Sequence, residues 1–386
     1  MGETAKMKIT IVGAGPAGLY AAILIRRHRP DIALRVVEQN RADDSFGFGV
    51  VFSEQALGFL EAEDPETVRL VAPYMQHWSD IAVVHRGERI VIDGIGFSGI
   101  GRLQLIQFFQ QRAAELGIHP EYSTRIQDPR TLDSDLVIGS DGLNSVVRAS
   151  GDHGESVVSL DNRFVWYGAD RAFDALTQTF IDTEYGPMNA HHYSYMPGRS
   201  TFIIEMRPEV FARTGFADMD EPAYRAVCER LFAGTLEGAR LIENRSVWRR
   251  FPKLSCSRWH DGNRVLVGDA LHTAHYSIGS GTRLALEDVV ALVAALREHD
   301  WNVAAALPAY QARRAPILAK IVDAANRSAD WYERYDRHMA LDPWPFALSY
   351  IHRAGRLDAA RLRALAPQFS AGAEARGLSL DPEAAA

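Results

Sequence analysis

The feature that most constrains this chain is a glycine-rich turn close to its amino terminus. Residues 8–12 read KITIV, a β-branched run typical of a buried parallel strand, and the sequence GAGPAG follows directly. Residues 16–28 then carry helix formers with apolar side chains on one face, and a second strand-like run covers 33–39. This order predicts a βαβ unit with the turn between its first strand and its helix.

The turn has the spacing of a dinucleotide-binding fingerprint, GxGxxG. Gly13 would permit the tight turn, Gly15 would let the backbone approach a pyrophosphate, and Gly18 would let helix and strand pack closely. Pro16 and Ala17 begin the helix, whose N-terminal amide groups carry partial positive charge toward the phosphates. The alternative is a plain tight turn.

An acidic residue stands where such a unit binds a ribose. Glu38 lies at the end of the second strand, 20 residues after Gly18, and its carboxylate would accept hydrogen bonds from ribose hydroxyls. With both strands, the helix and this acid in place, the sequence favours dinucleotide binding over a plain turn.

Composition argues against several other classes of protein. The 386 residues carry a net charge of −7 and no long block of lysine or arginine, so we expect no nucleic-acid partner. No stretch offers about 18 uninterrupted apolar residues, and we therefore expect no membrane partner. The two cysteines, Cys228 and Cys256, lack the spacing of a metal site and suit a reducing compartment. These features predict a cytoplasmic protein without a metal site.

Two later segments also have the pattern of parallel strands that end in turns. Residues 135–142 end in an aspartate–glycine turn, and residues 264–270 end in a glycine–aspartate turn. A helix is expected over 102–116, where apolar side chains line one face, and another over 282–298. Between these segments, aromatic-rich runs within residues 161–260 are typical of an antiparallel sheet.

We therefore predict an α/β protein of two domains in an α+β arrangement. A Rossmann-like nucleotide-binding domain would carry an inserted antiparallel sheet for the substrate, followed by C-terminal helices. The predicted boundaries are 1–75, 100–160 and 262–300 for the discontinuous nucleotide-binding domain, 76–99 and 161–261 for the sheet domain, and 301–386 for the C-terminal helical region. Residues 45–55 are expected to form a loop, the helices of 303–367 to be broken at prolines, and the tail after Gly372 to fray.

Three motifs in this order resemble those of one family of enzymes. GAGPAG near the start, DGLNSVVR at 141–148 and GDALH at 268–272 resemble the motifs of the single-component flavoprotein aromatic hydroxylases, the para-hydroxybenzoate hydroxylase class. The order and spacing fit over nearly the whole chain. The resemblance implies FAD as the cofactor, with the glycine turn and Glu38 at its ADP half, and NADH or NADPH as the reductant.

The resemblance also assigns polar residues to the cofactor. Asp269 would hold the ribityl and pyrophosphate region of FAD, and Arg102, which heads a helix, would contact the cofactor as well. Asp141 in the middle motif would be a third contact, although an aspartate–glycine turn is more often only a turn. His272 in the GDALH turn is expected to make structural hydrogen bonds.

The reactive end of FAD would lie beside two segments. The backbone of Gly279, Gly281 and Thr282 would border the isoalloxazine ring, because the glycines leave amide groups exposed at the start of the next helix. The substrate pocket is expected to be walled by four residues: Val50, Val51, Phe52 and Tyr276. Here the chain has HYS at 275–277 and GSG at 279–281, where many members of the family carry a proline and GQG or GKG.

A general base that removes the hydroxyl proton of the substrate would add about 10²–10⁴-fold to the rate. Three residues are candidates by position: His275 in the loop beside the flavin ring, and His192 and Tyr193 in the inserted sheet. The alternative for each is a packed or hydrogen-bonded sheet residue. His191 and Tyr195 belong to the same aromatic run and carry the same two interpretations.

A narrower resemblance points to a class of substrate. DDSFGFGVVFSEQ at 43–55 and FVWYGADRAFDA at 164–175 look like segments of the subgroup that hydroxylates aryl-coenzyme A thioesters. This resemblance implies an FAD-dependent, NAD(P)H-consuming hydroxylase that uses O2, through a flavin C4a-hydroperoxide. The small-molecule substrate would be an electron-rich aromatic ring as a CoA ester, such as salicylyl-CoA, oxidised at carbon 5. The protein would act as a monomer or a homodimer.

Other interpretations stay open at this point. The same chemistry could act on a free aromatic or an indole derivative, the fold could serve as a prenyl-protein chaperone without flavin, or the enzyme could be a double-bond reductase. Five basic residues could meet the phosphates of coenzyme A, or could equally be solvated surface charges. They are Arg171, Arg245, Arg249, Arg250 and Lys253.

Overall fold

A five-stranded sheet follows from the βαβ unit at the start of the chain. The computed structural model describes residues 6–355 and 357–381, with only the backbone described for residues 54–57. The strand order is β16-β17-β8-β1-β2, and all neighbours are parallel except β16 and β17. The strands are β1 (Lys8–Val12), β2 (Ala33–Val37), β8 (Leu136–Gly139), β16 (His260–Asp261) and β17 (Arg264–Leu266).

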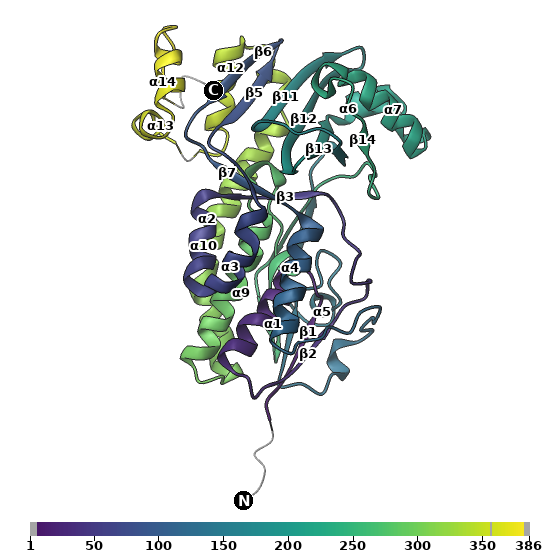
Figure 1. Ribbon diagram of the computed structural model, residues 1–386, viewed down its shortest axis with the longest axis vertical. Helices are drawn as coiled ribbons and strands as arrows, with labels where there is room; N and C mark the ends of the chain where they lie inside the picture. Colours follow the sequence, from purple (N-terminus) through teal and green to yellow (C-terminus); the bar gives the residue numbers. More distant parts are fainter. Residues whose placement is uncertain (1–5, 356, 382–386) are drawn as a thin grey trace, which may run out of the picture.

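Four helices share the hydrophobic core of this sheet. α1 (Pro16–His28) contacts α4 (Arg102–Glu115) and α9 (Gly281–Glu298), and α9 contacts α10 (Val303–Tyr332). Figure 1 shows these helices beside the strands in the lower part of the molecule. α1 is buried from Pro16 to Ile25, because apolar residues surround that part of the helix.

α10 is continuous through two prolines, where the sequence predicted breaks. Pro308 and Pro316 lie on its exposed side, while Leu307 and Leu318 are buried in the core. Packing against α9 therefore outweighs the backbone hydrogen bonds that the prolines remove. At about 1.5 Å per residue, α10 is about 45 Å long, so it reaches from the lower core to Tyr332 in a second, upper core.

Residues 49–53 form a strand where a loop was predicted. β3 (Gly49–Ser53) pairs antiparallel with β7 (Phe97–Gly101), which also pairs with β4 (Gln76–Trp78). Figure 1 shows β3 and β7 crossing the narrow middle of the molecule. The run GVVFS is short and glycine-flanked, so its pairing with β7 depends on a partner that is distant in the sequence. α2 (Glu54–Glu63) and α3 (Pro65–Val71) follow β3.

The predicted antiparallel sheet is present in the upper part of the molecule. It has seven strands in the order β14-β10-β13-β12-β11-β5-β6, and only β5 and β11 are parallel. The strands are β5 (Ile81–His85), β6 (Glu88–Ile92), β10 (Arg163–Ala169), β11 (Leu176–Thr183), β12 (Gly186–Met196), β13 (Arg199–Met206) and β14 (Leu241–Ile242). A separate pair joins β9 (Glu155–Ser159) to β15 (Pro252–Cys256).

Helices from two parts of the chain cover this sheet. Three helices that the sequence did not predict lie within residues 208–236 and share a core with β10, β12 and β13. They are α6 (Pro208–Thr214), α7 (Glu221–Leu231) and α8 (Ala233–Leu236). α12 (Pro343–His352) contacts β5 and β6, and α14 (Pro367–Glu374) contacts β6. The short α5 (Val146–Ala149), α11 (Tyr335–His338) and α13 (Ala359–Leu365) complete the set of α-helices.

The prediction that the tail frays after Gly372 is wrong for the residues that the structure describes. Gly372 lies inside α14, where a Cβ atom would come 2.5 Å from the ring of Trp344. The Trp344 ring stacks on Phe369 at 5.6 Å, and Leu380 beyond the helix is buried. Aromatic packing therefore orders this segment despite its alanine- and glycine-rich composition.

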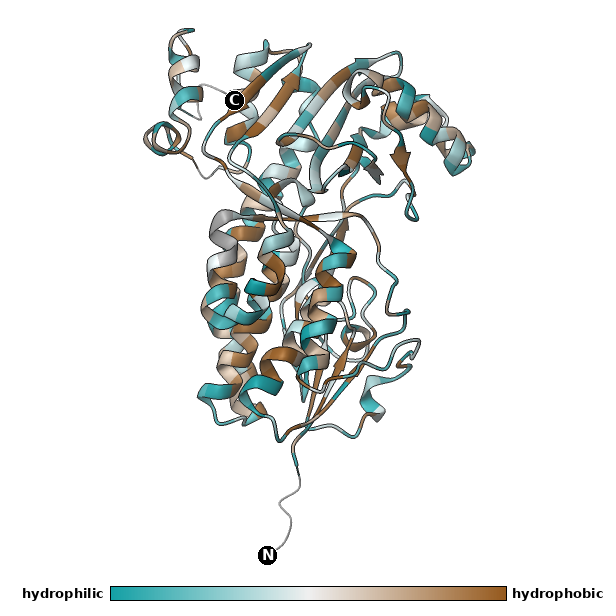
Figure 2. Cartoon of the chain, viewed as in Figure 1, coloured by the Kyte–Doolittle hydropathy of each residue, from teal (hydrophilic) through white to brown (hydrophobic). Residues whose placement is uncertain are grey.

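Figure 2 shows hydrophobic residues concentrated on the strands of both large sheets. The α/β architecture predicted from the sequence, with an antiparallel sheet and C-terminal helices, is confirmed. Across residues 6–355 and 357–381, no helix combines the length and apolarity needed to cross a membrane. The same residues contain no cluster of three or more histidine, cysteine or acidic side chains arranged to hold a metal ion.

Replacing Gly18 by alanine tests the close approach of α1 to the turn before it. The added Cβ would lie 1.9 Å from the carbonyl oxygen of Gly13, so we expect the free energy of unfolding to fall by about 3 kcal/mol. In Gly234→Ala, no described atom lies within 4 Å of the new Cβ, and stability should hold or rise by about 0.5 kcal/mol. Chemical denaturation measures both; equal stability of the two variants would contradict this packing.

Candidate active site

The glycine turn leaves the amino end of α1 facing open space. Gly13 has φ +101°, and a Cβ there would lie 2.5 Å from the carbonyl oxygen of Ser140. No described atom lies within 4 Å of a Cβ added at Gly15, which is the N-cap of α1 and offers no capping side chain. Pro16 and Ala17 form the first turn. The free amide groups at this end suit a phosphate.

The carboxylate of Glu38 lies beside the same turn. It accepts hydrogen bonds from the amide of Ala14 at 2.8 Å, and from the amide and side chain of Asn40 at 2.8 and 2.7 Å. These bonds orient Glu38 at the carboxyl end of β2. The structure therefore brings together Glu38 and the glycines that the sequence selected.

Arg102 and Asp269 are opposite charges that attract each other electrostatically. Burial lowers the pKa of the Arg102 guanidinium and raises the pKa of the Asp269 carboxyl, while their mutual attraction opposes both shifts. The buried Nε of Arg102 has no hydrogen-bond partner among the described residues. Asp269 is exposed, so its carboxylate is accessible to a ligand. A guanidinium with a free Nε donor and an accessible carboxylate fit the phosphates and hydroxyls of FAD.

Hydrogen bonds of the middle motif, residues 141–148, connect its own turn to the glycine–aspartate turn at 268–270. Asp141 accepts hydrogen bonds from the hydroxyl of Ser145 at 2.5 Å and the amide of Val146 at 2.7 Å, at the start of α5. The Arg148 guanidinium donates to the carbonyl of Ala270 at 2.9 Å. These contacts give Asp141 the role of a turn-forming residue, and they fix the glycine–aspartate turn through Arg148.

A buried acid that the sequence analysis missed holds that turn from the other side. Asp288 on α9 accepts hydrogen bonds from the amide of Gly268 at 3.1 Å and from Arg314 at 2.9 Å, and lies 2.7 Å from Nε2 of His272. Burial alone would raise the pKa of Asp288, but His272 and Arg314 hold it below its ordinary value. His272 is therefore structural, as expected. An acid within the apolar run LALEDVVAL was the available signal.

A hydrogen bond connects the loop before α9 to α10. The side chains of His275 and Ser277 lie 2.8 Å apart, and Ser277 lies 2.7 Å from Ser328 on α10. Gly279 has φ +62°, and a Cβ there would lie 2.7 Å from Val51 on β3. Gly281 and Thr282 form the first turn of α9, which has no capping side chain. The end of this helix is therefore a second set of free amide groups.

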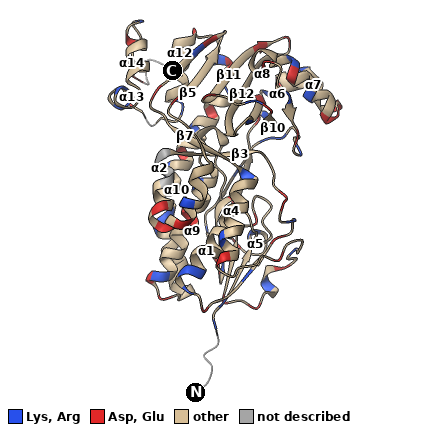
Figure 3. Cartoon of the chain, in the orientation of Figure 1, with Lys and Arg blue, Asp and Glu red and all other residues tan. Residues whose placement is uncertain are grey.

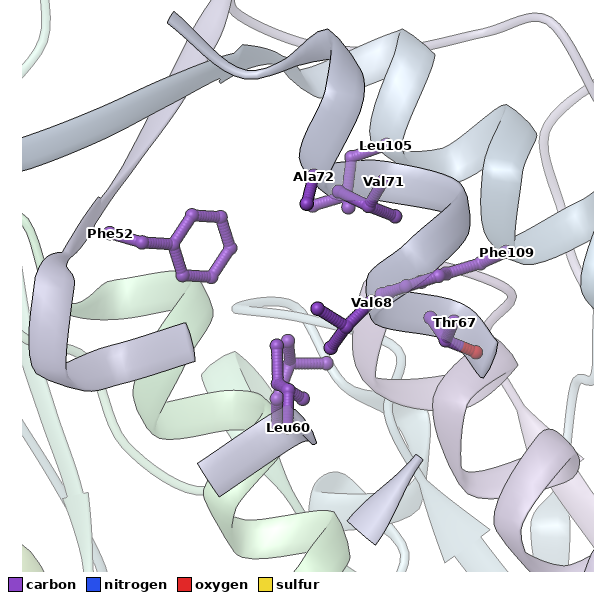
Figure 4. Close-up of a pocket in the computed structure, with 9 residues that line it drawn as sticks. Phe52, Leu60, Thr67, Val68, Val71, Ala72, Leu105 and Phe109 are labelled. Carbon is purple, nitrogen blue, oxygen red and sulfur yellow. The ribbon is translucent and has the colours of Figure 1, made fainter. Parts of the chain in front are cut away.

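The three predicted pocket residues of β3 do not lie together. Val51 faces the loop at Gly279, whereas Val50 and Phe52 point to the opposite face and join the lower core. Figure 4 shows the Phe52 ring among apolar side chains of α2, α3 and α4. The alternation of side chains along a strand forces this separation, so Val51 alone of the three lines the loop.

The same alternation separates the candidates on β12. Tyr193 donates a hydrogen bond to the carbonyl of Gly49 at 2.8 Å, and its ring faces β3 and β4. The His192 ring lies on the other face, 4.0 Å from the ring of Phe173 and 5.4 Å from that of Phe202. His192 is thus a packed sheet residue and lies apart from the loop at His275.

An aromatic cluster gathers around Tyr276. Its ring centroid lies 4.2 Å from that of His275, 5.1 Å from Phe164 and 6.4 Å from His191, whose ring is 5.6 Å from Tyr193. Burial lowers the pKa of His275 and of His191 to about 3, so both are neutral at pH 7. Neither nitrogen of His191 has a hydrogen-bond partner among the described residues. Tyr276 keeps some accessible surface.

Glu205 on β13 lies directly behind this cluster, and sequence reasoning missed it. Its carboxylate accepts hydrogen bonds from the hydroxyl of Tyr276 and from the side chain of Asn162, the latter at 2.7 Å. The residue is 2% exposed, and burial raises the pKa of Glu205 to about 7. The only signal in the sequence was an acid inside the apolar strand STFIIEM.

The basic residues considered for coenzyme A differ in how they are paired. Arg171, Arg250 and Lys253 lie 3.0, 2.6 and 3.7 Å from acidic side chains. The Arg245 guanidinium lies 4.7 Å from the centre of the Phe46 ring. Its contact with an acid, Asp44, is longer than those of the other three, at 4.0 Å. The Arg249 guanidinium hydrogen-bonds to the carbonyl of Arg245 at 3.3 Å. Figure 3 shows charges of both signs interspersed over the outer helices and loops.

Comparisons with known proteins identify the family of this chain. Residues 106–325 match the family described as FAD binding domain. The chain is 37% identical to a salicyloyl-CoA 5-hydroxylase of Streptomyces sp, over 90% of this chain and 70% of the relative. It is 36% identical to a 3-hydroxy-4-methyl-anthranilyl-[aryl-carrier protein] 5-monooxygenase of Streptosporangium sibiricum, over 85% of this chain and 90% of the relative.

Two further similarities extend the comparison. The chain is 32% identical to a protodeoxyviolaceinate monooxygenase of Chromobacterium violaceum, over 90% of this chain and 94% of the relative. The fold resembles that of a 2-methyl-3-hydroxypyridine-5-carboxylic acid oxygenase, with a TM-score of 0.70 and 19% identity over 92% of this chain and 98% of the other.

Replacing Arg102 by methionine tests the cofactor cleft. A charge-assisted hydrogen bond contributes about 1.5–3 kcal/mol, so we expect FAD to bind about 10- to 100-fold more weakly. The apoprotein should be no less stable, because the buried Arg102 Nε, which has no hydrogen-bond partner among the described residues, is gone. Flavin fluorescence titration measures binding. The control is Arg130→Met, an exposed residue paired with Asp128; the same loss of affinity in both variants would contradict the assignment.

Proposed function

The chain belongs to the FAD-dependent aromatic monooxygenases, and we propose that its substrate is an electron-rich aryl-CoA thioester such as salicylyl-CoA, hydroxylated at carbon 5. The observation that carries the proposal is the similarity, at 37% and 36% identity, to two relatives whose names specify thioesters. Both names place an aryl group on coenzyme A or a carrier protein and the oxygenation at position 5.

FAD, when bound, supplies the activation of O2 and the transfer of one oxygen atom to the ring, with NADH or NADPH as the electron source. The balance is one NAD(P)H, one proton, one O2 and one aromatic ring consumed, with NAD(P)+, water and the hydroxylated ring formed. Glu38 would hold the ribose, and the backbone from Gly13 to Gly18 the pyrophosphate. Arg102 would pair with a phosphate oxygen, and Asp269 would accept from ribityl hydroxyls.

The ring end of the cleft would be built from the loop before α9 and one face of β12. The backbone of Gly279, Gly281 and Thr282 would border the flavin, while Val51 and Tyr276 would line the substrate pocket. Their apolar and aromatic surfaces exclude water from the reacting ring and hold it in one orientation. Orientation is valuable here because oxygen transfer must reach one carbon of the substrate.

The histidines and Tyr193 are poorly suited to accept the hydroxyl proton. A pKa of about 3 makes His275 a weak base at neutral pH. Burial raises the pKa of Tyr193, and its hydroxyl is already hydrogen-bonded to Gly49. His192 lies on the far face of β12. We therefore assign His275 and Tyr193 to the shape of the pocket rather than to proton transfer.

A second candidate function is the oxidation of a free aromatic or indole-derived substrate. It is favoured by the 32% identity to a protodeoxyviolaceinate monooxygenase over 90% of this chain. Under this alternative, substrate binding would not require a pantetheine arm, and Arg245, which lies beside Phe46, would play no part in it.

Substrate comparison separates these two functions. We expect salicylyl-CoA to stimulate NAD(P)H oxidation and to give a product heavier by one oxygen atom, with kcat/KM at least about tenfold higher than for free salicylate. Benzoyl-CoA, which lacks the ring hydroxyl, is the matched control and should give no product. Equal kcat/KM for the ester and the free acid would favour the second function.

Arg245→Ala tests the recognition of the coenzyme A phosphates. Arg245 is exposed and only weakly paired, so a phosphate would be its strongest partner. We expect KM for salicylyl-CoA to rise about threefold to tenfold, and KM for a short N-acetylcysteamine thioester to stay unchanged. Arg230→Ala, an exposed arginine paired with Glu184, is the control. A rise in KM for both thioesters would argue against phosphate recognition.

A further inference from the structure

Glu205 is a buried acid for which the fold supplies no cation. It lies on β13 in the middle of the seven-stranded sheet, paired with Phe164 on β10 and Asn189 on β12. No lysine, arginine or histidine among residues 6–355 and 357–381 forms an ion pair with it. Burying a carboxylate without a cation costs several kcal/mol, and each hydrogen bond left unmade costs roughly 1–3 kcal/mol. An acid kept at this position despite that cost is a candidate for a functional role.

The groups that face Glu205 come from three directions. Tyr276 reaches it from the loop before α9, and Asn162 from the turn before β10. Glu333, at the end of α10, accepts the amide hydrogen of Asn162 at 2.9 Å, and its negative charge further raises the pKa of Glu205.

The remaining charged and titratable neighbours do not bind the carboxylate. Tyr332 donates its hydroxyl to Gln178, and Tyr335 donates to the carbonyls of Pro187 and Glu205. The Arg207 guanidinium donates hydrogen bonds to the backbone carbonyl of Glu333 and to the carboxylate of Asp336. Tyr276 is thus the one hydroxyl-bearing side chain, within the part of the chain that the structure describes, whose hydroxyl is hydrogen-bonded to the carboxylate of Glu205.

We propose that Glu205 accepts the ring-hydroxyl proton of the substrate during oxygenation, and that Tyr276 relays this proton. The inference deepens the proposed function and rests on it. Tyr276 connects the proposed substrate site to Glu205: its ring packs in the aromatic cluster with His275 and His191 and keeps some accessible surface, while its hydroxyl is hydrogen-bonded to Glu205. Neutral His275 and His191 beside it are the weaker proton acceptors.

The transfer balances in protons at each atom. The substrate O–H bond breaks as its proton moves to the Tyr276 oxygen, and the Tyr276 O–H bond breaks as that proton moves to Oε2 of Glu205. The electron pair left on the substrate oxygen enriches the ring carbon para to it, where oxygen is added, and the C–H bond of that carbon breaks with release of a proton as the ring regains aromaticity. The proton returns from Glu205 along the same path when the product regains its ring hydroxyl.

The first arm of the test uses substrate-free holoenzyme and follows flavin absorbance with pH. Wild type should show a transition near pH 7, because Glu205 ionises there. The transition should vanish in Glu205→Gln. In Tyr276→Phe it should move to higher pH, because the lost hydrogen bond favoured the charged carboxylate. A transition that persists unchanged in Glu205→Gln would overturn the assignment.

The second arm follows product formation across the same pH range with salicylyl-CoA. The wild-type kcat should rise with pH through about 7 as the carboxylate forms. Glu205→Gln should lose this pH dependence and about 100-fold in kcat with little change in KM, and Tyr276→Phe should lose a similar factor. A purely structural role would lower kcat and raise KM while leaving the shape of the pH profile intact, and that outcome would refute the relay.

Glu333→Gln is the matched control, because it removes a nearby acid without touching Tyr276. It should keep the flavin transition, moved slightly to lower pH, and keep kcat within about threefold of wild type. If the wild-type enzyme turns over no thioester, the proposed function is refuted. The flavin-absorbance measurement of the first arm still decides, without substrate, whether Glu205 titrates beside the cofactor. Turnover by wild type with an unaltered pH profile in Glu205→Gln would end the relay alone.

Discussion

A single buried carboxylate, that of Asp288, holds together the segments on which the site depends. It is fully enclosed and meets the Gly268 amide, His272 and Arg314 at once, and so joins α9, α10 and the turn after β17. Because an isolated carboxylate is costly in a protein interior, all three partners must be in place for it to remain charged. This requirement fixes the turn that carries Asp269, which we propose binds FAD.

Around the proposed FAD and substrate site, the fold leaves several polar groups without a full set of hydrogen-bond partners. Arg102 lacks a partner for Nε, and His191 lacks one for either ring nitrogen; Asp269 and Tyr276 keep accessible surface in otherwise buried surroundings. Native interiors satisfy most such groups, so the unpaired nitrogens of Arg102 and His191 are candidates to bind ligand atoms. We propose that phosphates and hydroxyls of FAD bind beside Arg102 and Asp269, and that the aromatic substrate binds beside Tyr276.

Prediction from the sequence succeeded where structure is local. The strand, turn and helix of residues 8–28 lie where the pattern placed them, because glycine spacing and helix propensity act within a few residues. It failed for β3, whose partner β7 is distant in the chain, and for α10, where packing overrides two prolines. It also placed Val50 and Phe52 beside Val51, because the orientation of the strand was unknown.

The sequence by itself determined the cofactor class, since the three glycine-centred motifs carry their own backbone geometry and recur in one family. It also selected Glu38, Arg102 and Asp269 as candidate FAD contacts, of which only Asp269 lies within one of the three motifs. Only the tertiary structure could single out Glu205, because an acid in an apolar strand acquires its properties from what surrounds it. Burial behind Tyr276, and the absence of a paired cation among the described residues, are products of long-range packing that no local pattern encodes.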